Sequence, residues 1–207
     1  MVEGLLDAAV AQSRGLTEVV AYVGGQPSYA QLRTLHRHGV SAVTICPDPD
    51  AGGDAGILSF LKNLDHSIRA YVAPELPEGK DPDEVIVEHG VEGWRRHIAQ
   101  SIRGPIYRAS SILQEHDLSS ANERDDALEE LTRYAADLPE RDLDDIVGPA
   151  AEPLRLQPST LRTALVQPAP RIGGALAPDD HSEIHSAETY HLARLCPFGS
   201  KRRHVST

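Results

Sequence analysis

Two aspartates separated by one residue are the part of this sequence best suited to chemistry. Asp48 and Asp50 follow a short apolar, β-branched run at residues 40–46 and lead into small residues. Side chains at i and i+2 of an extended segment point to the same side, and Pro49 keeps the segment extended. Two carboxylates held this way are the hard oxygen ligands that Mg²⁺ takes beside a phosphate-bearing substrate. The pair therefore predicts a metal site.

The same residues are also typical of an ordinary turn. Asp, Pro and Gly are common turn residues, so the segment is equally consistent with a strand-to-helix connection that binds nothing. An EF-hand loop is excluded, because Gly52 stands at a ligand position and Ser59 at the position of the bidentate Glu. The sequence has no dinucleotide-binding glycine fingerprint and no P-loop. The choice between turn and metal site depends on what the fold brings near the pair.

Composition limits the class of protein. The 207 residues carry a net charge of −11, which argues against a domain that coats nucleic acid with a basic surface. Two cysteines, Cys46 and Cys196, are too few for a disulfide framework or a zinc knuckle. His36 and His38 are predicted at a solvated helix end. With no membrane-length apolar run and no signal peptide, we expect a cytoplasmic protein.

Strand-like and helix-like segments alternate from Leu5 to Gly90. Strands are expected at 19–23, 40–46 and 68–72, and helices at 5–14, 28–38, 58–64 and 82–89. Ser28 with Gln31 predicts a capping box. This alternation is typical of an α/β fold with a doubly wound sheet of parallel strands.

Parallel strands bring the residues that follow them to one edge of the sheet. Here those residues are Glu3, the Gly24–Gly25 pair, Asp48 with Asp50, and the segment 80–83 that holds Lys80, Asp81 and Asp83. Several carboxylates at one edge repel one another unless cations lie between them. This convergence favours the metal site over the plain turn.

The pattern changes after residue 92. Residues 93–166 have helical periodicity, with a capping box predicted at Ser120 and Glu123 and a break at Pro149. Residues 167–207 have no periodicity and are predicted to be a disordered tail. We therefore expect three parts: an α/β domain at 1–92, a helical region at 93–166 and the tail.

The order of motifs resembles the Toprim domain, most closely that of bacterial DnaG-type DNA primases. The motifs, which lie within residues 1 to about 95, are Glu3-Gly4 with Asp7, then Gly24-Gly25, then Asp48-Pro49-Asp50, then Gly79-Lys80-Asp81-Pro82-Asp83. The resemblance implies a Toprim-like sheet and metal-dependent synthesis of RNA primers. The chain would be a nucleotidyltransferase that uses single-stranded DNA as template and nucleoside triphosphates as substrates.

The resemblance also implies roles for individual residues. Glu3, Asp48 and Asp50 would be catalytic and would hold Mg²⁺ or Mn²⁺, and Asp81 and Asp83 would approach the same ions. Gly4, Asp7 and Lys80 would support the site, Lys80 through contact with phosphate. Three of the residues named for the site also have a simpler explanation. Asp81 is a good helix N-cap without catalysis, Asp7 can be a solvated helix residue, and Lys80 can be an ordinary surface lysine.

The chain departs from the family at its start. The strand before Glu3 is reduced to Met1-Val2, and the loss of a central strand is expected to leave neighbouring backbone groups unpaired. The zinc-binding and basic subdomains that precede Toprim in primases are absent from the sequence. We therefore expect a primase fragment or partial subunit, whose partner would be the missing N-terminal portion or a replicative helicase. Two alternatives are a Toprim metal-dependent nuclease or phosphodiesterase, and an inactive module that binds a helicase.

Overall fold

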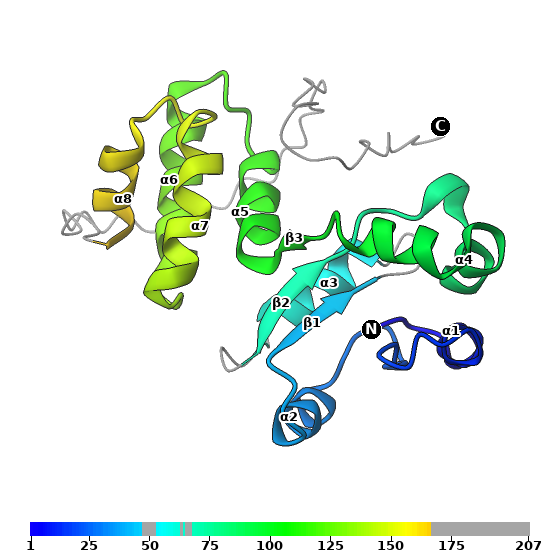
Figure 1. Ribbon diagram of the computed structural model, residues 1–207. Coiled ribbons are helices and arrows are strands. Elements are labelled where there is room, and N and C mark those ends of the chain that lie inside the picture. Colours follow the sequence, from blue (N-terminus) through cyan, green and yellow to red (C-terminus); the bar gives the residue numbers. More distant parts are fainter. Residues whose placement is uncertain (47–52, 63, 65–67, 167–207) are drawn as a thin grey trace, which may run out of the picture. The chain divides into compact units, whose positions relative to one another are not determined.

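The computed structural model describes residues 1–46, 53–62, 64 and 68–166 (Figure 1). These residues form two compact units that divide after Ser110. The boundary predicted after residue 92 stays a prediction, and the predicted tail at 167–207 lies outside the described residues. No helix of the described part has both the length and the apolar composition that a bilayer crossing requires.

The first unit is built around a small sheet whose strand order is β1-β2-β3. The strands are β1 (Ala42–Ile45), β2 (Arg69–Val72) and β3 (Ile102–Arg103). β1 and β2 are parallel, as the α/β pattern predicts, with Val43 opposite Ala70. β3 runs antiparallel to β2, and this short strand was not predicted within the helical region.

The first residues of the chain extend this sheet beyond β1. Met1 accepts a hydrogen bond at its carbonyl from the Cys46 N–H (2.8 Å). On the other side, the Val2 N–H donates to Val20 O (3.0 Å), and the Tyr22 N–H donates to Val2 O (3.0 Å). The segment at 1–3 therefore lies between β1 and the segment at 20–23. The expected row of unpaired backbone groups is not present at these residues.

The strand predicted at 19–23 is wrong in extent. Only Ala21 forms a bridge, with Val2, and the pairing is parallel. Two features of the backbone limit the pairing to this single bridge. The partner segment ends at Gly4, which is the N-cap of the next helix, and Val23 (φ 51°) and Gly24 (φ 97°) take left-handed conformations that turn the chain away.

Four helices cover the two faces of the sheet. They are α1 (Leu5–Ser13), α2 (Tyr29–Arg37), α3 (Gly53–Lys62) and α4 (Pro82–Ile98), and a 3₁₀ turn, η1 (Pro77–Gly79), precedes α4. One core cluster joins Ala8 of α1 and Ile86 of α4 to Val2. A second joins Leu32 of α2 and Phe60 of α3 to β1 and β2. The sheet is thus covered on both faces, as the doubly wound pattern predicts.

The helices begin and end for local reasons. The predicted capping box of α2 forms, with the Gln31 N–H donating to Ser28 Oγ (3.3 Å) and the Ser28 N–H donating to Gln31 Oε1 (2.8 Å). Gly90 interrupts α4 at φ 67°, as predicted for the helix end, but helix resumes beyond it to Ile98. Residues 91–98 stay helical because Trp94 is buried in the first core cluster.

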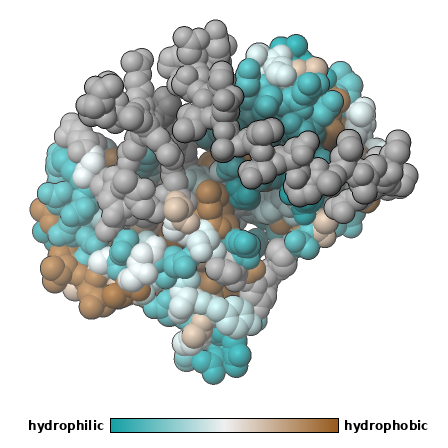
Figure 2. All heavy atoms as spheres, turned by 180° about the vertical axis from the view of Figure 1, so that it is seen from behind, coloured by the Kyte–Doolittle hydropathy of each residue, from teal (hydrophilic) through white to brown (hydrophobic). Residues whose placement is uncertain are grey.

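The α1 pattern differs from a simple apolar stripe. Its buried residues are Asp7, Ala8 and Ala11, whereas the side chains of Leu5 and Leu6 are 68% and 78% exposed. Figure 2 shows apolar side chains gathered on the left, where α1 lies in that view. The helix was predicted correctly, but the residue turned inward next to Gly4 is an aspartate.

The second unit is helical. After α5 (Gly104–Gln114), which crosses the division, it contains α6 (Ala121–Ala135), α7 (Glu140–Ala151) and α8 (Pro158–Val166). Pro149 lies inside α7 rather than ending it. The capping box predicted at Ser120 and Glu123 is wrong: the Ser120 side chain makes no cap bond. Glu123 instead contacts the imidazole Nδ1 of His116 (3.2 Å).

Candidate functional site

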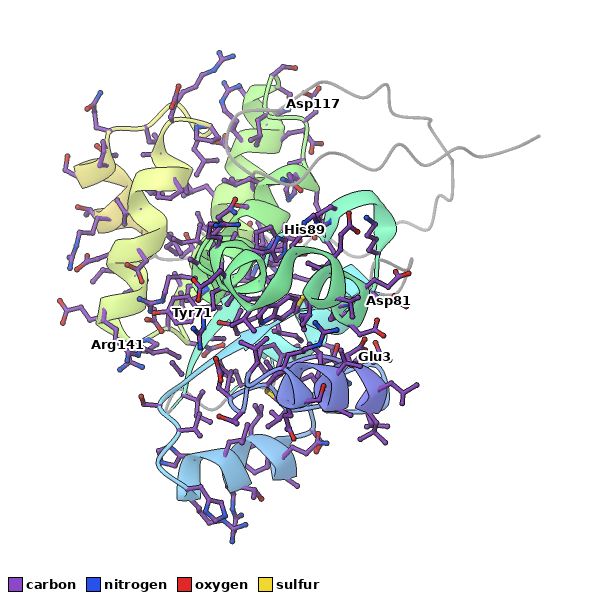
Figure 3. The ribbon with its side chains drawn as sticks, turned by 45° about the vertical axis from the view of Figure 1, so that its right-hand side comes forward. Glu3, Tyr71, Asp81, His89, Asp117 and Arg141 are labelled. Atoms are coloured by element: carbon purple, nitrogen blue, oxygen red, sulfur yellow. The ribbon has the colours of Figure 1, made fainter. Side chains whose placement is uncertain are left out.

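The beginnings of α1 and α4 meet at the carboxyl edge of the sheet. The Asp83 N–H donates to Asp7 Oδ1 (3.2 Å), across 76 residues of sequence. Figure 3 shows Glu3, just before α1, and Asp81, just before α4, at the same end of the unit. We call Glu3, Asp7, Asp81 and Asp83 the acidic edge.

Asp7 is the buried member of the acidic edge, with 8% of its surface exposed. Burial raises the pKa of its carboxyl group. The backbone hydrogen bond from Asp83 opposes this shift, whereas the charges of Asp83 and Asp81 and a side-chain hydrogen bond with Asp83 add to it. The interpretation of Asp7 as a solvated helix residue is therefore wrong.

Gly4 allows Asp7 to take this position. A Cβ atom at Gly4 would stand 2.2 Å from Asp7 Oδ2, far inside van der Waals contact. Gly4 is also the N-cap of α1, with extended φ and ψ that any residue can adopt. The requirement for glycine therefore comes from the close approach of the carboxylate and not from the backbone conformation.

Glu3 is held by a glycine turn. The Gly25 N–H donates to Glu3 Oε1 (3.1 Å), and Gly24 and Gly25 both have positive φ. The first turns of α3 reach the same turn, because a Cβ atom at Gly56 would lie 2.8 Å from Gly25 O. Glu3 and the start of α3 therefore both approach the glycine turn. This agrees with the predicted convergence of Glu3 with the Gly24–Gly25 pair.

Asp81 and Asp83 open α4. Glu84 Oε2 accepts from the Asp81 N–H (3.0 Å), which is one half of a capping box. Asp83 Oδ1 accepts from the Glu84 N–H (2.8 Å). Asp81 is exposed and Asp83 is half-buried. Asp81 thus has its local capping function, whereas the contact with Asp7 comes from the Asp83 N–H. The approach of Asp81 to a metal ion stays a prediction.

Lys80 directly precedes Asp81, and its side chain forms an ion pair with Glu88. Its Nζ lies 2.5 Å from Glu88 Oε2, and the hydrogen bond from Lys80 lowers the pKa of the exposed Glu88 carboxyl group. A phosphate contact through Lys80 would have to exchange with this ion pair. The role predicted for Lys80 stays a prediction.

Asp48 and Asp50 lie outside the described residues. The described chain is interrupted between buried Cys46, which follows β1, and Gly53, the first residue of α3. Among the residues that the structure describes, no group of three or more His, Cys, Asp or Glu side chains is placed to hold a metal ion. The ligand role predicted for Asp48 and Asp50 stays a prediction.

The donor chemistry of the acidic edge fits a divalent cation. Its four side chains offer only carboxylate oxygens, the ligands that Mg²⁺ and Mn²⁺ prefer. The raised pKa of Asp7 reflects first the burial of its own carboxyl group and then the nearby charges of Asp83 and Asp81. The sequence pattern did not reveal two contributions, the burial of Asp7 and the close contact at Gly56. The small residues at 51–56 were the available signal for that contact.

Comparison with known families identifies the first part of the chain. A family model, Toprim_2, described as Toprim-like, matches residues 1–86. The match spans every residue of the acidic edge and the Gly24–Gly25 turn.

Two curated relatives are DNA primases. The DNA primase of Clostridium acetobutylicum is 27% identical over 143 residues, which cover 68% of this chain and 22% of the relative. The DNA primase of Deinococcus radiodurans is 26% identical over 176 residues, which cover 83% of this chain and 30% of the relative. The chain thus spans less than a third of the length of these relatives.

Solved structures share the fold. The structure of the DnaG catalytic core superimposes with a TM-score of 0.66 at 21% identity, covering 77% of this chain and 53% of that one. A DnaG primase catalytic domain bound to ssDNA gives a TM-score of 0.58 at 19% identity, covering 77% and 52%. Together with the family match and the primase relatives, this identifies the first part of the chain as a Toprim domain of the DnaG primase type.

Proposed function

We propose that this chain supplies the metal-binding and nucleotide-handling part of a DNA primase, and that it takes part in metal-dependent primer synthesis. The observation that carries the proposal is the contact of the Asp83 N–H with Asp7, together with that of Gly25 with Glu3. These contacts gather the motif residues of three separate segments at one edge of the sheet. A domain kept only as a scaffold would not need carboxylates gathered at such an edge.

In this proposal the carboxylates have different roles. Glu3, Asp48 and Asp50 hold Mg²⁺ or Mn²⁺, and Asp81 and Asp83 approach the same ions. Divalent cations held by these residues would supply positive charge for the triphosphate and the pyrophosphate leaving group and would favour ionisation of the primer 3′-hydroxyl.

Other residues position these carboxylates. Asp7 accepts the Asp83 N–H and fixes the start of α4 against α1. The Gly25 N–H orients Glu3 by binding Oε1, which leaves Oε2 for a ligand. Lys80 exchanges Glu88 for a phosphate group when nucleotide is present.

The partners follow from the same proposal. Nucleoside triphosphates and a single-stranded DNA template are the substrates, and the cytoplasm is the location. The remaining two thirds or more of a primase would come from other segments or chains, since the curated relatives are several times longer. A replicative helicase is a further proposed partner.

Calorimetric titration with Mn²⁺ tests the metal site. We expect saturable binding to the chain and its loss in the Asp48→Ala/Asp50→Ala double variant. The matched control is Asp125→Ala/Asp126→Ala, which makes the same charge change on the exposed side of α6 and should bind as the unchanged protein does. Equal binding by the chain and the Asp48→Ala/Asp50→Ala variant would contradict the proposed site.

An activity assay separates primer synthesis from the alternatives. The chain is incubated with Mn²⁺, single-stranded DNA and labelled nucleoside triphosphates, alone and together with the zinc-binding and basic portion of a related primase. Nucleotide incorporation that needs Asp48 and Asp50 supports the proposal. DNA cleavage without incorporation would instead identify a Toprim nuclease or phosphodiesterase.

A further inference from the structure

Helix α2 carries positive charge in an otherwise acidic protein. The whole chain has 31 Asp and Glu residues and a net charge of −11, yet residues 19–47 contain no acidic residue at all. This stretch includes α2 and the turns at both of its ends. Its charged side chains are therefore all cationic or titratable to cations.

The exposed face of α2 carries a stripe of aromatic and basic residues. Tyr29, Arg33, His36 and Arg37 are spaced i, i+4, i+7 and i+8, which places them on one face of a helix. All four are exposed, Tyr29 by 53%. Leu32, which lies beside this stripe on the helix, is buried. The stripe thus presents one aromatic ring and two arginines to solvent, and we call these four residues the α2 stripe.

The arginines of the α2 stripe are not neutralised within the described part of the chain. Arg37 donates from Nη2 to the Thr34 hydroxyl (3.1 Å), a neutral partner. Within the described ranges, no carboxylate lies within ion-pair distance of Arg33 or Arg37. Other basic residues do have acidic partners: Lys80 pairs with Glu88 and Arg162 with Asp144.

The α2 stripe begins near the acidic edge and leads away from it. Tyr29 follows Gly25, the partner of Glu3, by four residues. The helix runs antiparallel to β1, because Arg37 is joined to the start of β1 through residues 38–41. Arg69, at the start of β2 and opposite Ala42, lies at the same far edge and is exposed.

Whether the carboxylates of the acidic edge cancel the positive charge of the α2 stripe depends on the distance between the two. The four residues of β1 alone span about 13 Å, at about 3.3 Å per residue. The screening length at physiological salt is about 8 Å. Repulsion from the carboxylates therefore fades before the far end of α2, and a polyanion can bind there despite the net negative charge.

We propose that the α2 stripe binds single-stranded nucleic acid, with a base stacked on Tyr29 and phosphates bound by Arg33 and Arg37. An exposed aromatic ring beside arginines favours a single strand, because a base face must be open to stack on the ring. The two arginines lie about 6 Å apart along the helix axis, at 1.5 Å per residue. The surface is separate from the metal ligands and rests on the proposed function only in that a polynucleotide is the substrate. It gives a strand engaged at the acidic edge a path away from that edge.

Fluorescence anisotropy with a labelled oligothymidylate tests the stripe, with EDTA present so that metal binding plays no part. We expect binding that weakens from about 50 to 200 mM salt. Arg33→Gln/Arg37→Gln should weaken it and lower the slope of log K against log salt by about 1.4, since each phosphate contact contributes about 0.7. The matched control, Arg95→Gln/Arg96→Gln on exposed positions of α4, should keep the original slope.

The aromatic contact is tested separately. Tyr29→Ala should weaken binding at least about fivefold, because stacking on one ring is worth that much or more, whereas Tyr29→Phe should bind as the unchanged chain does. Failure of the unchanged chain to bind the oligonucleotide at low salt overturns the inference. So does an equal loss in the α4 control variant. Either result leaves the Mn²⁺ titration, and with it the proposed function, unaffected.

Discussion

Asp7 keeps a carboxyl group in a place where its charge is unfavourable. It is buried between α1 and α4, and its pKa is raised by burial and by the neighbouring Asp83 and Asp81. A group of this kind is kept in enzymes when a bound cation or a proton transfer needs it. In the absence of metal it lowers the stability of the folded protein at neutral pH.

We therefore expect Asp7→Asn to stabilise the metal-free protein. The amide keeps an oxygen to accept the Asp83 N–H and removes the buried charge. The gain should be about 1 kcal/mol, a rise in Tm of roughly 2–4 °C. Thermal unfolding in EDTA at pH 7.5 measures it, and Asp126→Asn on the exposed side of α6 is the control that should change little.

The same pair of proteins should show a defined pH dependence. The folded-state pKa of Asp7 lies above its ordinary value of 3.8. The stabilising contribution of the protonated group is therefore complete below pH 3.8 and is lost as the pH rises through the folded-state pKa. The Tm difference between Asp7→Asn and the unchanged protein should be smallest near pH 4 and larger at pH 7.5. A constant difference across this range would contradict the assigned burial.

Gly4→Ala tests the space beside Asp7. The added Cβ would displace the Asp7 carboxylate and weaken its bond with Asp83, so we expect a loss of about 1–3 kcal/mol in stability together with weaker Mn²⁺ binding. Calorimetry and thermal unfolding measure the two effects. The Gly4→Ala/Asp7→Ala double variant removes the clash and should recover part of the stability, but none of the metal affinity. Independent, additive effects would mean that the two residues are not in contact.

Among the helices and strands, the contact of α3 with the glycine turn decides how the acidic edge is assembled. Gly56 brings the start of α3 against Gly25 O, and Gly25 in turn binds Glu3. A change in α3 therefore reaches Glu3 through the turn, without touching a carboxylate.

Gly56→Ala should destabilise the protein by about 1–3 kcal/mol, because its Cβ would meet a backbone oxygen that has little freedom to move. Gly148→Ala in α7 is the matched control. No atom lies within 4 Å of its added Cβ, so it should stabilise α7 by about 0.5–1 kcal/mol. Urea unfolding of both variants measures the difference. Equal effects would show that α3 does not press on the turn.

Across the whole chain, the predicted site belongs to the first unit alone. Every residue of the acidic edge precedes Ser110, and the second unit has its own core, which includes Leu131 and Ile146. A cavity in the second core should therefore leave metal binding intact. With two units, unfolding need not be a single transition.

Leu131→Ala and Ile86→Ala form the corresponding pair of variants. Both remove a fully buried side chain, and each should lower the stability of its own unit by about 2–5 kcal/mol. Mn²⁺ affinity should stay within twofold for Leu131→Ala and fall for Ile86→Ala, which lies in α4 beside Asp83. Loss of Mn²⁺ binding in Leu131→Ala would assign the second unit a part in the site.

Much of the fold was predictable because its signals are local. The apolar run at 40–46 and the capping box of Ser28 with Gln31 each depend on a few neighbouring residues, and both segments formed where expected. The motif order gave the family for the same reason. The predicted capping box that did not form, at Ser120 and Glu123, also has a local cause. Glu123 does not form the predicted capping box, because its carboxylate contacts His116 of the preceding loop, a residue outside the capping pattern.

The sequence alone determined most of the alternation of elements and the family, and it predicted which carboxylates approach one edge. Three features depended on packing between distant segments: the pairing of Met1 and Val2 on both sides, the burial of Asp7 against α4, and the contact of Gly56 with Gly25. Hydrophobic periodicity reports which face of a helix is buried and not what it is buried against. Burial raises the pKa of Asp7 most, and the charge of Asp83, 76 positions away in the sequence, raises it further; no local pattern records a contact over that distance.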